Sequence, residues 1–205
     1  MVDSKKLRIG IYAGAFDPVH VGHIAFALQA LDAANLDEVI FMPERRPRDK
    51  PGVEHFAHRV AMLKAALAPH PRLSVLETVE AQFSVKRTFP GLKTLLPQAQ
   101  LVFLMGSDTV MSLPVWRYAS RLMEQCEFAV GLRATGQRIE VVKSITTWNP
   151  GLNGVVLIDS YAPTVSSSKI RQAIRHNKPQ QGLLRSVHRY AKREWLYVSP
   201  ANQAA

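Results

Sequence analysis

Six short blocks of apolar residues, separated by segments with the spacing of amphipathic helices, constrain the fold more than any other feature of this chain. The blocks are LRIGIYAG, EVIFMP, RLSVLE, AQLVFLMG, CEFAVGL and NGVVLID, and each has the length of a buried strand. Helical patterns over residues 20–34 and 55–68 separate the early blocks. Because this alternation implies right-handed crossover connections, we predict an α/β fold with a Rossmann-like, doubly wound parallel sheet.

The length and composition are those of one domain. The chain has 205 residues, of which 47% are hydrophobic, and this is enough to enclose a single core. We therefore expect one domain over residues 1–205, with a C-terminal helical part from about residue 166. We also expect two long loops, over residues 43–54 and from residue 133 to about residue 153, at the strand ends where parallel sheets bind ligands.

Several features predict a cytoplasmic protein with negatively charged ligands. No apolar run is long enough to cross a bilayer, and residues 1–6 lack the apolar segment of a signal peptide. The single cysteine, Cys126, fits a reducing compartment, and we interpret it as a small core residue rather than a nucleophile. The net charge of +10 leaves nucleic acid, anionic lipid and phosphorylated metabolites open. Without an arginine-rich tail or an aromatic-interleaved basic patch, we expect neither nucleic acid nor a membrane as partner.

Two histidines mark the start of the first expected helix, in the stretch AGAFDPVHVGH. Gly14 follows the first strand, where a small residue lets a phosphate approach the backbone amides. His20 and His23 are three residues apart and share one helix face, at the end of the helix that attracts anions. A pair of capping or surface histidines and a zinc pair are the alternatives, but the sequence offers no further zinc ligand nearby. The pattern favours a phosphate site.

A second helix start follows the last expected strand, in YAPTVSSSKIRQAIRHNKP. Ser166 or Ser167 can cap this helix, and its first turn carries Ser168 and Arg171. Taken alone, the stretch predicts only a well-capped helix. Its position in the chain favours a second helix N-terminus that directs hydroxyls and a guanidinium at the same crevice as the histidines.

Together, HVGH and SSSKIR resemble the HxGH and SSTxIR signatures of the nucleotidylyltransferase superfamily, and the chain resembles the bacterial nicotinate mononucleotide adenylyltransferases over nearly its whole length. The resemblance extends to FMPERRPRDKP, HRVAMLKAAL, LVFLMGSDTVMSLPVW and CEFAVGLR. It implies a nucleotidylyltransferase-type fold with C-terminal helices. It also implies an enzyme of NAD biosynthesis that moves AMP from ATP to nicotinate mononucleotide, giving nicotinate adenine dinucleotide and pyrophosphate.

The resemblance assigns roles to individual residues. His20 and His23 would be catalytic, through contacts with the ATP phosphates and the transition state. The other ATP-binding residues would be Gly14, Ala15, Phe16, Gly106, Asp108, Ser167, Ser168 and Arg171. The pyridine mononucleotide would be bound by Lys50, Ser84, Trp116 and Arg133. Mg²⁺ would be held mainly by the ATP phosphates, with no protein ligands of its own.

The residues themselves also allow plainer interpretations. Asp108 could simply cap a helix, Trp116 could be a core residue, and Lys50 could be one of several basic residues in a solvated loop. We expect His55 and His58, at a helix start, to lie at the surface rather than to bind a metal.

Several positions depart from the family's pattern. Ala13 and Ala15 replace a glycine and a hydroxyl residue, and Asp49 stands where a neutral or positive residue is usual. Lys86 and Arg87 replace an Asp-Thr pair on the mononucleotide side. Arg117 follows Trp116 where the family often has a second aromatic residue. These departures leave open whether the acceptor carries nicotinate, nicotinamide or another group.

Three alternative functions follow from the same features. One is adenylyl transfer to another phosphate acceptor such as phosphopantetheine, which the chain length and GSDTVMSLPVW oppose. A second is a degenerate member that binds nucleotide without turnover. A third is a relative of the class I tRNA synthetases, which also carry an HxGH signature, although the chain has no room for an anticodon-binding domain. The sequence leaves open the oligomeric state, a homodimer included, and the metal preference.

Overall fold

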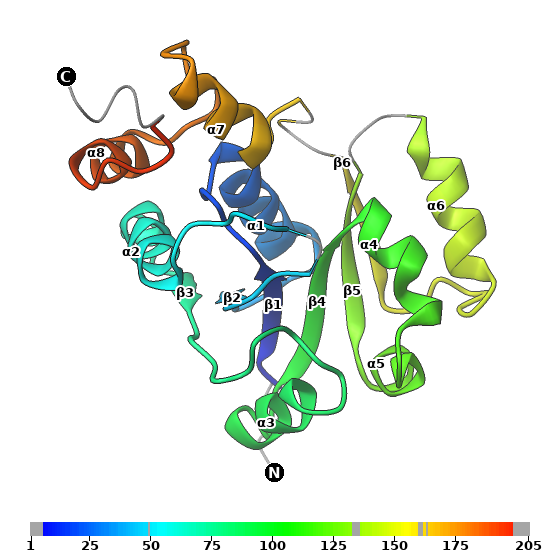
Figure 1. Cartoon of the computed structure of the whole chain (residues 1–205). Helices are drawn as coiled ribbons and strands as arrows, with labels where there is room; N and C mark the ends of the chain where they lie inside the picture. Colours follow the sequence, from blue (N-terminus) through cyan, green and yellow to red (C-terminus); the bar gives the residue numbers. More distant parts are fainter. Residues whose placement is uncertain (1–5, 49, 133–135, 160–161, 163, 199–205) are drawn as a thin grey trace.

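All six apolar blocks form strands of one parallel sheet (Figure 1). The computed structural model describes residues 6–48, 50–132, 136–159, 162 and 164–198. The strands are β1 (Arg8–Gly14), β2 (Glu38–Pro43), β3 (Leu73–Val75), β4 (Gln100–Gly106), β5 (Glu127–Leu132) and β6 (Val155–Asp159). Their order is β3-β2-β1-β4-β5-β6, and each neighbouring pair is parallel. The predicted doubly wound, Rossmann-like sheet is confirmed.

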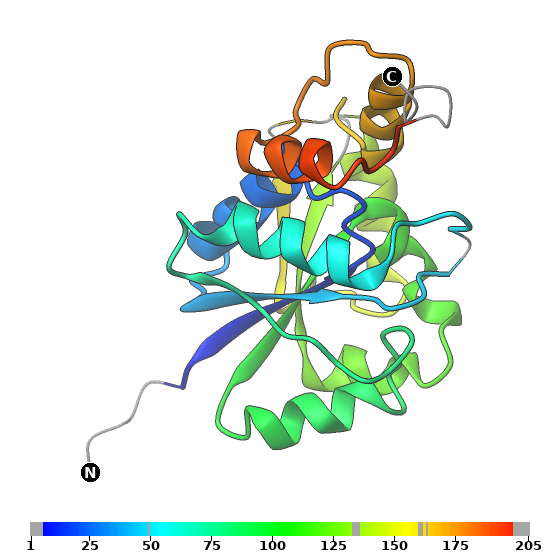
Figure 2. The same ribbon diagram turned by 60° about the vertical axis from the view of Figure 1, so that its left-hand side comes forward.

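Helices cover both faces of this sheet. They are α1 (Val21–Ala33), α2 (Phe56–Leu67), α3 (Thr88–Leu95), α4 (Ser107–Ser112), the 3₁₀ helix η1 (Leu113–Val115), α5 (Ala119–Gln125), α6 (Gln137–Thr146), α7 (Ser167–Arg175) and α8 (Arg185–Arg193). One core cluster includes Ile24 of α1, Leu63 of α2 and Val187 of α8, and the other includes Leu122 of α5 and Val141 of α6. Helix α8 lies against α2, as Figures 1 and 2 show from two directions.

The prediction of one of the two long loops is wrong. Residues 137–146, within the stretch expected as a loop from residue 133 to about residue 153, form α6. Val141 and Ile145 are four residues apart and fully buried, so they give this helix the apolar side that packs on the second core cluster. The other expected loop, residues 43–54, begins with the last residue of β2 and ends before α2, as predicted.

The strand order reverses its direction at the first strand. In this order the chain runs outward from β1 to β2 and β3 on one side, and through β4 to β5 and β6 on the other. Ligands of open parallel sheets bind outside the carboxyl ends of the strands at such a switch point. Gly14 and Gly106, the last residues of β1 and β4, lie at this edge. In the described part of the chain, no helix is both long and apolar enough to span a membrane.

Candidate active site

The turn that follows β1 is held by aromatic packing. Phe16 is buried, adopts a positive φ of 49°, and its ring centroid lies 5.3 Å from those of both Tyr12 and Phe41. A Cβ on Gly14 would come within 3.2 Å of Cζ of Phe16. The glycine therefore leaves room for the phenyl ring that fixes the turn.

The two histidines lie together at the start of α1. His20 is the N-cap residue, His23 is the third residue of the helix, and their ring centroids are 3.7 Å apart. The backbone N–H of His20 donates a hydrogen bond of 3.2 Å to Nδ1 of His23. Because Nδ1 of His23 accepts here, Nε2 is the ring nitrogen that can donate to a ligand. The two rings lie side by side as expected, but His20 precedes the helix instead of lying in its first turn.

The stretch SSSKIR contacts the turn that precedes HVGH. Ser166 caps α7 by accepting a hydrogen bond from the backbone N–H of Lys169 at 3.3 Å. The hydroxyl of Ser167 donates to the carbonyl oxygen of Pro18 at 3.0 Å. Nη1 of Arg171 donates to the carbonyl oxygen of Asp17 at 2.7 Å and lies 3.6 Å from its Oδ2. Two segments about 150 residues apart in sequence therefore meet at the turn after β1.

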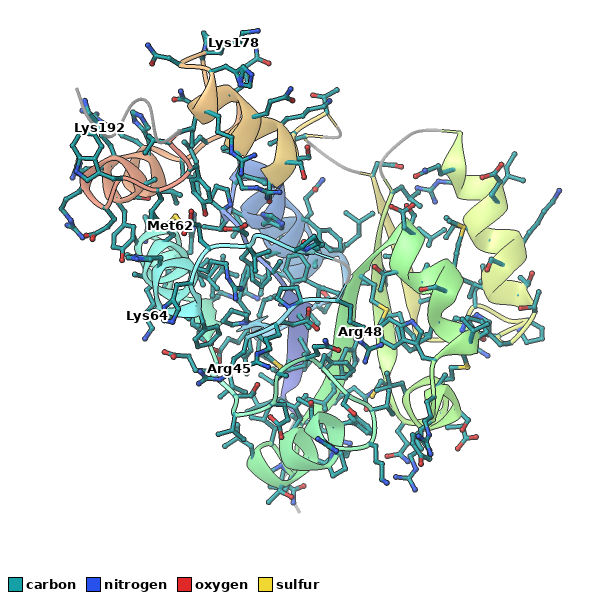
Figure 3. The ribbon with its side chains drawn as sticks, in the orientation of Figure 1. Arg45, Arg48, Met62, Lys64, Lys178 and Lys192 are labelled. Carbon is teal, nitrogen blue, oxygen red and sulfur yellow. The ribbon has the colours of Figure 1, made fainter. Side chains whose placement is uncertain are left out.

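Asp17 is the centre of a buried network that the sequence analysis missed. Its side chain is 2% exposed, and its Oδ1 accepts hydrogen bonds from the hydroxyl of Tyr197 at 2.6 Å and from the backbone N–H of Glu54 at 3.3 Å. The same hydroxyl lies 4.0 Å from Sδ of Met62 on α2, which Figure 3 labels. Burial, with Asp17 as the next cause, raises the pKa of Tyr197 above its ordinary value. In the sequence, Asp17 lies between Phe16 and His20, just before HVGH. This position was the signal from which its role could have been inferred.

The end of β4 lies at the same edge of the sheet as the end of β1. Gly106 is the N-cap residue of α4, and Ser107, which is fully buried, donates from its hydroxyl to Oε1 of Gln137 at 3.1 Å. Asp108 lies in the first turn of α4 with an exposed side chain. The helix is therefore capped at Gly106, so the interpretation of Asp108 as a mere N-cap is wrong.

The residues expected on the mononucleotide side lie on other elements. Trp116 follows η1, is half-buried against the second core cluster, and donates from Nε1 to the hydroxyl of Ser112 at 3.3 Å. Ser84 precedes α3, and its hydroxyl accepts from the backbone N–H of Arg87 at 3.4 Å. Lys50 is exposed on the loop after β2, and Arg133 lies outside the described residues.

Three cations surround one aromatic ring near Trp116. Nζ of Lys86 lies 6.0 Å from the ring centroid of Tyr118, and the guanidinium carbons of Arg117 and Arg121 lie 5.2 and 5.7 Å from it. Lys86 and Arg117 are two of the residues that depart from the family pattern. They therefore gather on one aromatic residue and make this part of the surface electropositive.

The surroundings of the remaining candidate residues suit structural roles. Cys126 is half-buried, and desolvation raises the pKa of its thiol to about 12, which suits a core residue rather than a nucleophile. His55 is exposed, and His58 is half-buried with Nδ1 3.1 Å from the hydroxyl of Tyr190. The part of the chain that the structure describes holds no group of three or more His, Cys, Asp or Glu side chains suited to a metal.

Comparisons with known proteins give the relationships of this chain. Residues 11–173 match the family described as cytidylyltransferase-like. The probable nicotinate-nucleotide adenylyltransferase of Synechococcus sp. (strain JA-3-3Ab) is 32% identical over 97% of this chain and 98% of its own length. The nicotinate-nucleotide adenylyltransferase of Bacillus subtilis (strain 168) is 32% identical over 94% and 99%. A solved structure of Plasmodium falciparum nicotinic acid mononucleotide adenylyltransferase complexed with NaAD is similar with a TM-score of 0.75, at 19% identity over 93% of this chain and 97% of that one.

Proposed function

The chain belongs to the nicotinate-nucleotide adenylyltransferases of the cytidylyltransferase-like group, and we propose that it transfers AMP from ATP to nicotinate mononucleotide. The products are nicotinate adenine dinucleotide and pyrophosphate, in NAD biosynthesis. One structural observation supports the proposal in addition to the sequence similarity. Ser167 and Arg171 of α7 contact the turn that leads into His20. The first turns of α7 and the turn that leads into α1 thus lie against each other, and two neighbouring helix N-termini suit a polyphosphate.

The reaction needs no protein nucleophile. The phosphate of the mononucleotide attacks the α-phosphorus of ATP in line, and pyrophosphate leaves from the opposite side. The protein contributes by positioning the two substrates and by stabilising negative charge in the transition state. The raised pKa of Cys126, about 12, accords with a mechanism that uses no thiolate.

We assign the ATP phosphates to the region around the α1 start. His20 and His23 donate to the ATP phosphates and stabilise the charge that develops during transfer. Ser167, Ser168 and Arg171 hold the β- and γ-phosphates. The backbone of three turn residues adds further contacts: Gly14, Ala15 and Phe16. On the neighbouring strand end, Gly106 and Asp108 face a ribose, to which the exposed carboxylate of Asp108 can accept hydrogen bonds.

In this proposal, Mg²⁺ would bind together with ATP and be held mainly by its phosphates. The described residues hold no cluster of metal ligands, and the phosphates of ATP offer oxygen ligands of the kind that Mg²⁺ prefers. When bound there, the ion neutralises phosphate charge. The protein's own groups at this place, two imidazoles and the Arg171 guanidinium, are donors and complement such a complex.

The acceptor lies on the side of Trp116. The indole offers a flat face for the pyridine ring, Ser84 offers a hydroxyl, and Lys50 and Arg133 offer charge for the 5′-phosphate. The cations around Tyr118 favour nicotinate, whose ring carries a carboxylate, over nicotinamide, whose ring does not. We therefore propose the nicotinate form as the preferred acceptor, with residues 1–205 acting as one domain in the cytoplasm.

Chromatography of the products tests this function. The purified protein is incubated with Mg-ATP and nicotinate mononucleotide, and nicotinate adenine dinucleotide and pyrophosphate are expected in equal amounts. ATP binding by isothermal titration without any turnover would instead support the degenerate member. Product with phosphopantetheine but not with the pyridine nucleotide would support the other acceptor class.

A further inference from the structure

Arg59 of α2 is a charged residue with no exposed surface, and the mechanism above does not use it. Its guanidinium donates three hydrogen bonds, all to backbone carbonyl oxygens: to Ala15 at 2.6 Å, to Glu54 at 2.9 Å and to Arg45 at 3.1 Å. Burial lowers the pKa of Arg59, and the negative charge of Asp17 opposes that effect. A buried charge is costly unless its donors are used, so these three bonds determine the geometry around Arg59.

The three carbonyls belong to two segments with different proposed substrates. Ala15 lies in the turn after β1, which we assign to the ATP phosphates. Arg45 and Glu54 stand near the two ends of the basic loop that carries Lys50, which we assign to the acceptor; Figure 3 labels Arg45 and Arg48 of this loop. A single planar guanidinium therefore holds the ATP turn and both ends of the acceptor loop.

The bond to Ala15 also sets the direction of an amide. In a trans peptide the C=O and N–H groups point in opposite directions. Since the carbonyl of Ala15 points to Arg59, the N–H of Phe16 points away from it. This amide is one of the backbone donors proposed for ATP, and Arg59 fixes its direction without touching the substrate.

Other contacts hold the same two segments together. The backbone N–H of Glu44 donates to the carbonyl oxygen of Gly14 at 2.9 Å, and that of Glu54 donates to Oδ1 of Asp17 at 3.3 Å. The ring of Phe56 lies 4.2 Å from the guanidinium carbon of Arg45 and 5.6 Å from that of Arg59. The loop thus meets the turn at both of its ends, and the Arg59 side chain is bonded to all three places.

We propose that Arg59 is a positioning residue that couples the ATP site to the acceptor loop. This inference rests on the proposed function. Lysine at this position keeps a positive charge but has a single nitrogen, so it cannot reproduce three bonds in the plane of a guanidinium. Loss of the shared anchor lets the turn and the loop shift relative to each other, and small misplacements of reacting groups cost much of the rate.

Arg59→Lys is the main test, and Arg72→Lys is its matched control. Arg72 also donates to backbone carbonyls, those of Asp37 and Leu36, but these precede β2 at the opposite edge of the sheet. We expect Arg59→Lys to lower kcat/KM about tenfold or more and to raise the KM of both ATP and the mononucleotide. Arg72→Lys should leave both KM values within about twofold of the parent, even if it lowers the Tm equally. Unchanged kinetics in a folded Arg59→Lys variant would overturn the proposal.

Limited proteolysis provides a readout that does not depend on activity. Within the loop trypsin can cut after Arg45 and Arg48, whereas Arg46 and Lys50 precede proline and resist it. A loop released from Arg59 should therefore be cut faster in Arg59→Lys than in Arg72→Lys. Equal cleavage of the two folded variants would overturn the proposed coupling even if the parent protein makes no dinucleotide. An inactive parent with accelerated cleavage in Arg59→Lys would refute the proposed function and leave the positioning role of Arg59 supported.

Discussion

The hydroxyl of Tyr197 donates a hydrogen bond of 2.6 Å to Oδ1 of Asp17, 180 residues earlier in the chain. Both side chains are buried, and the same carboxylate lies 3.6 Å from Arg171. The segment after α8 therefore reaches the turn where the two signature stretches meet. It stabilises that turn from the core side.

Tyr197→Phe should destabilise the protein. The substitution removes the shortest hydrogen bond to a buried carboxylate, and such a loss costs about 1–3 kcal/mol when the partner stays buried. We expect the urea midpoint to fall with little change in the slope of the transition. A variant as stable as the parent would show that Asp17 does not depend on this bond.

The contribution of Tyr197 should also depend on pH. Burial raises the pKa of its hydroxyl in the folded state above the ordinary value of 10.0. A group whose pKa is raised on folding stabilises fully below its unfolded pKa, and the stabilisation declines as the pH rises above it. The difference in unfolding free energy between the parent and Tyr197→Phe should therefore shrink as the pH rises from about 10 to about 12. A constant difference over this interval would contradict the assignment.

His20→Ala and His23→Ala should leave the fold intact and lower turnover. Each variant removes one donor for developing phosphate charge, and the loss of such a donor costs roughly two or more orders of magnitude in kcat. His188→Ala, on the exposed side of α8, is the matched control and should keep full turnover. Normal turnover in both signature variants would refute the phosphate site.

Cys126 should be inert to alkylation in the folded protein. With a pKa of about 12, the thiol is almost wholly protonated at pH 8, and only the thiolate reacts at a useful rate. Iodoacetamide at this pH should label the protein after unfolding in urea and hardly before. Rapid labelling of the native protein, with loss of activity, would identify an exposed, functional thiol instead.

Trp116→Ala should weaken binding of the mononucleotide selectively. Stacking of a base on an aromatic side chain contributes about 1–3 kcal/mol, so the KM for the acceptor should rise about tenfold or more, while that for ATP changes little. Trp195→Ala is the control, because Trp195 is 57% exposed and follows α8. An equal rise in both KM values would indicate a general structural role for Trp116.

The sequence predicted the strands because each is a local apolar pattern. Buried parallel strands are short, nearly continuous apolar runs, and all six were visible as such. Helix α6 was missed because Val141 and Ile145 are its only buried residues, so its apolar pattern is short and weak. The stretch therefore resembled a polar loop until its packing on the core was known.

The sequence was enough to identify HVGH and SSSKIR as site stretches, but not the side chains that fix the structure around them. Arg59 lies in an amphipathic helix, where an arginine is usually solvated, and nothing local marks it as fully buried. Tyr197 and Asp17 are joined across 180 residues, a distance at which no periodic pattern gives information. Such contacts depend on the tertiary packing of α8 and the segment after it, which a single sequence does not reveal.

Pyrophosphate release from Mg-ATP, with nicotinate mononucleotide, nicotinamide mononucleotide and phosphopantetheine offered separately, tests the central claim most directly. We predict rapid release with the nicotinate acceptor, weaker release with the nicotinamide acceptor, and none above background with phosphopantetheine. Release that is absent with all three acceptors, from a protein that is folded and binds ATP, would contradict the proposed adenylyl transfer.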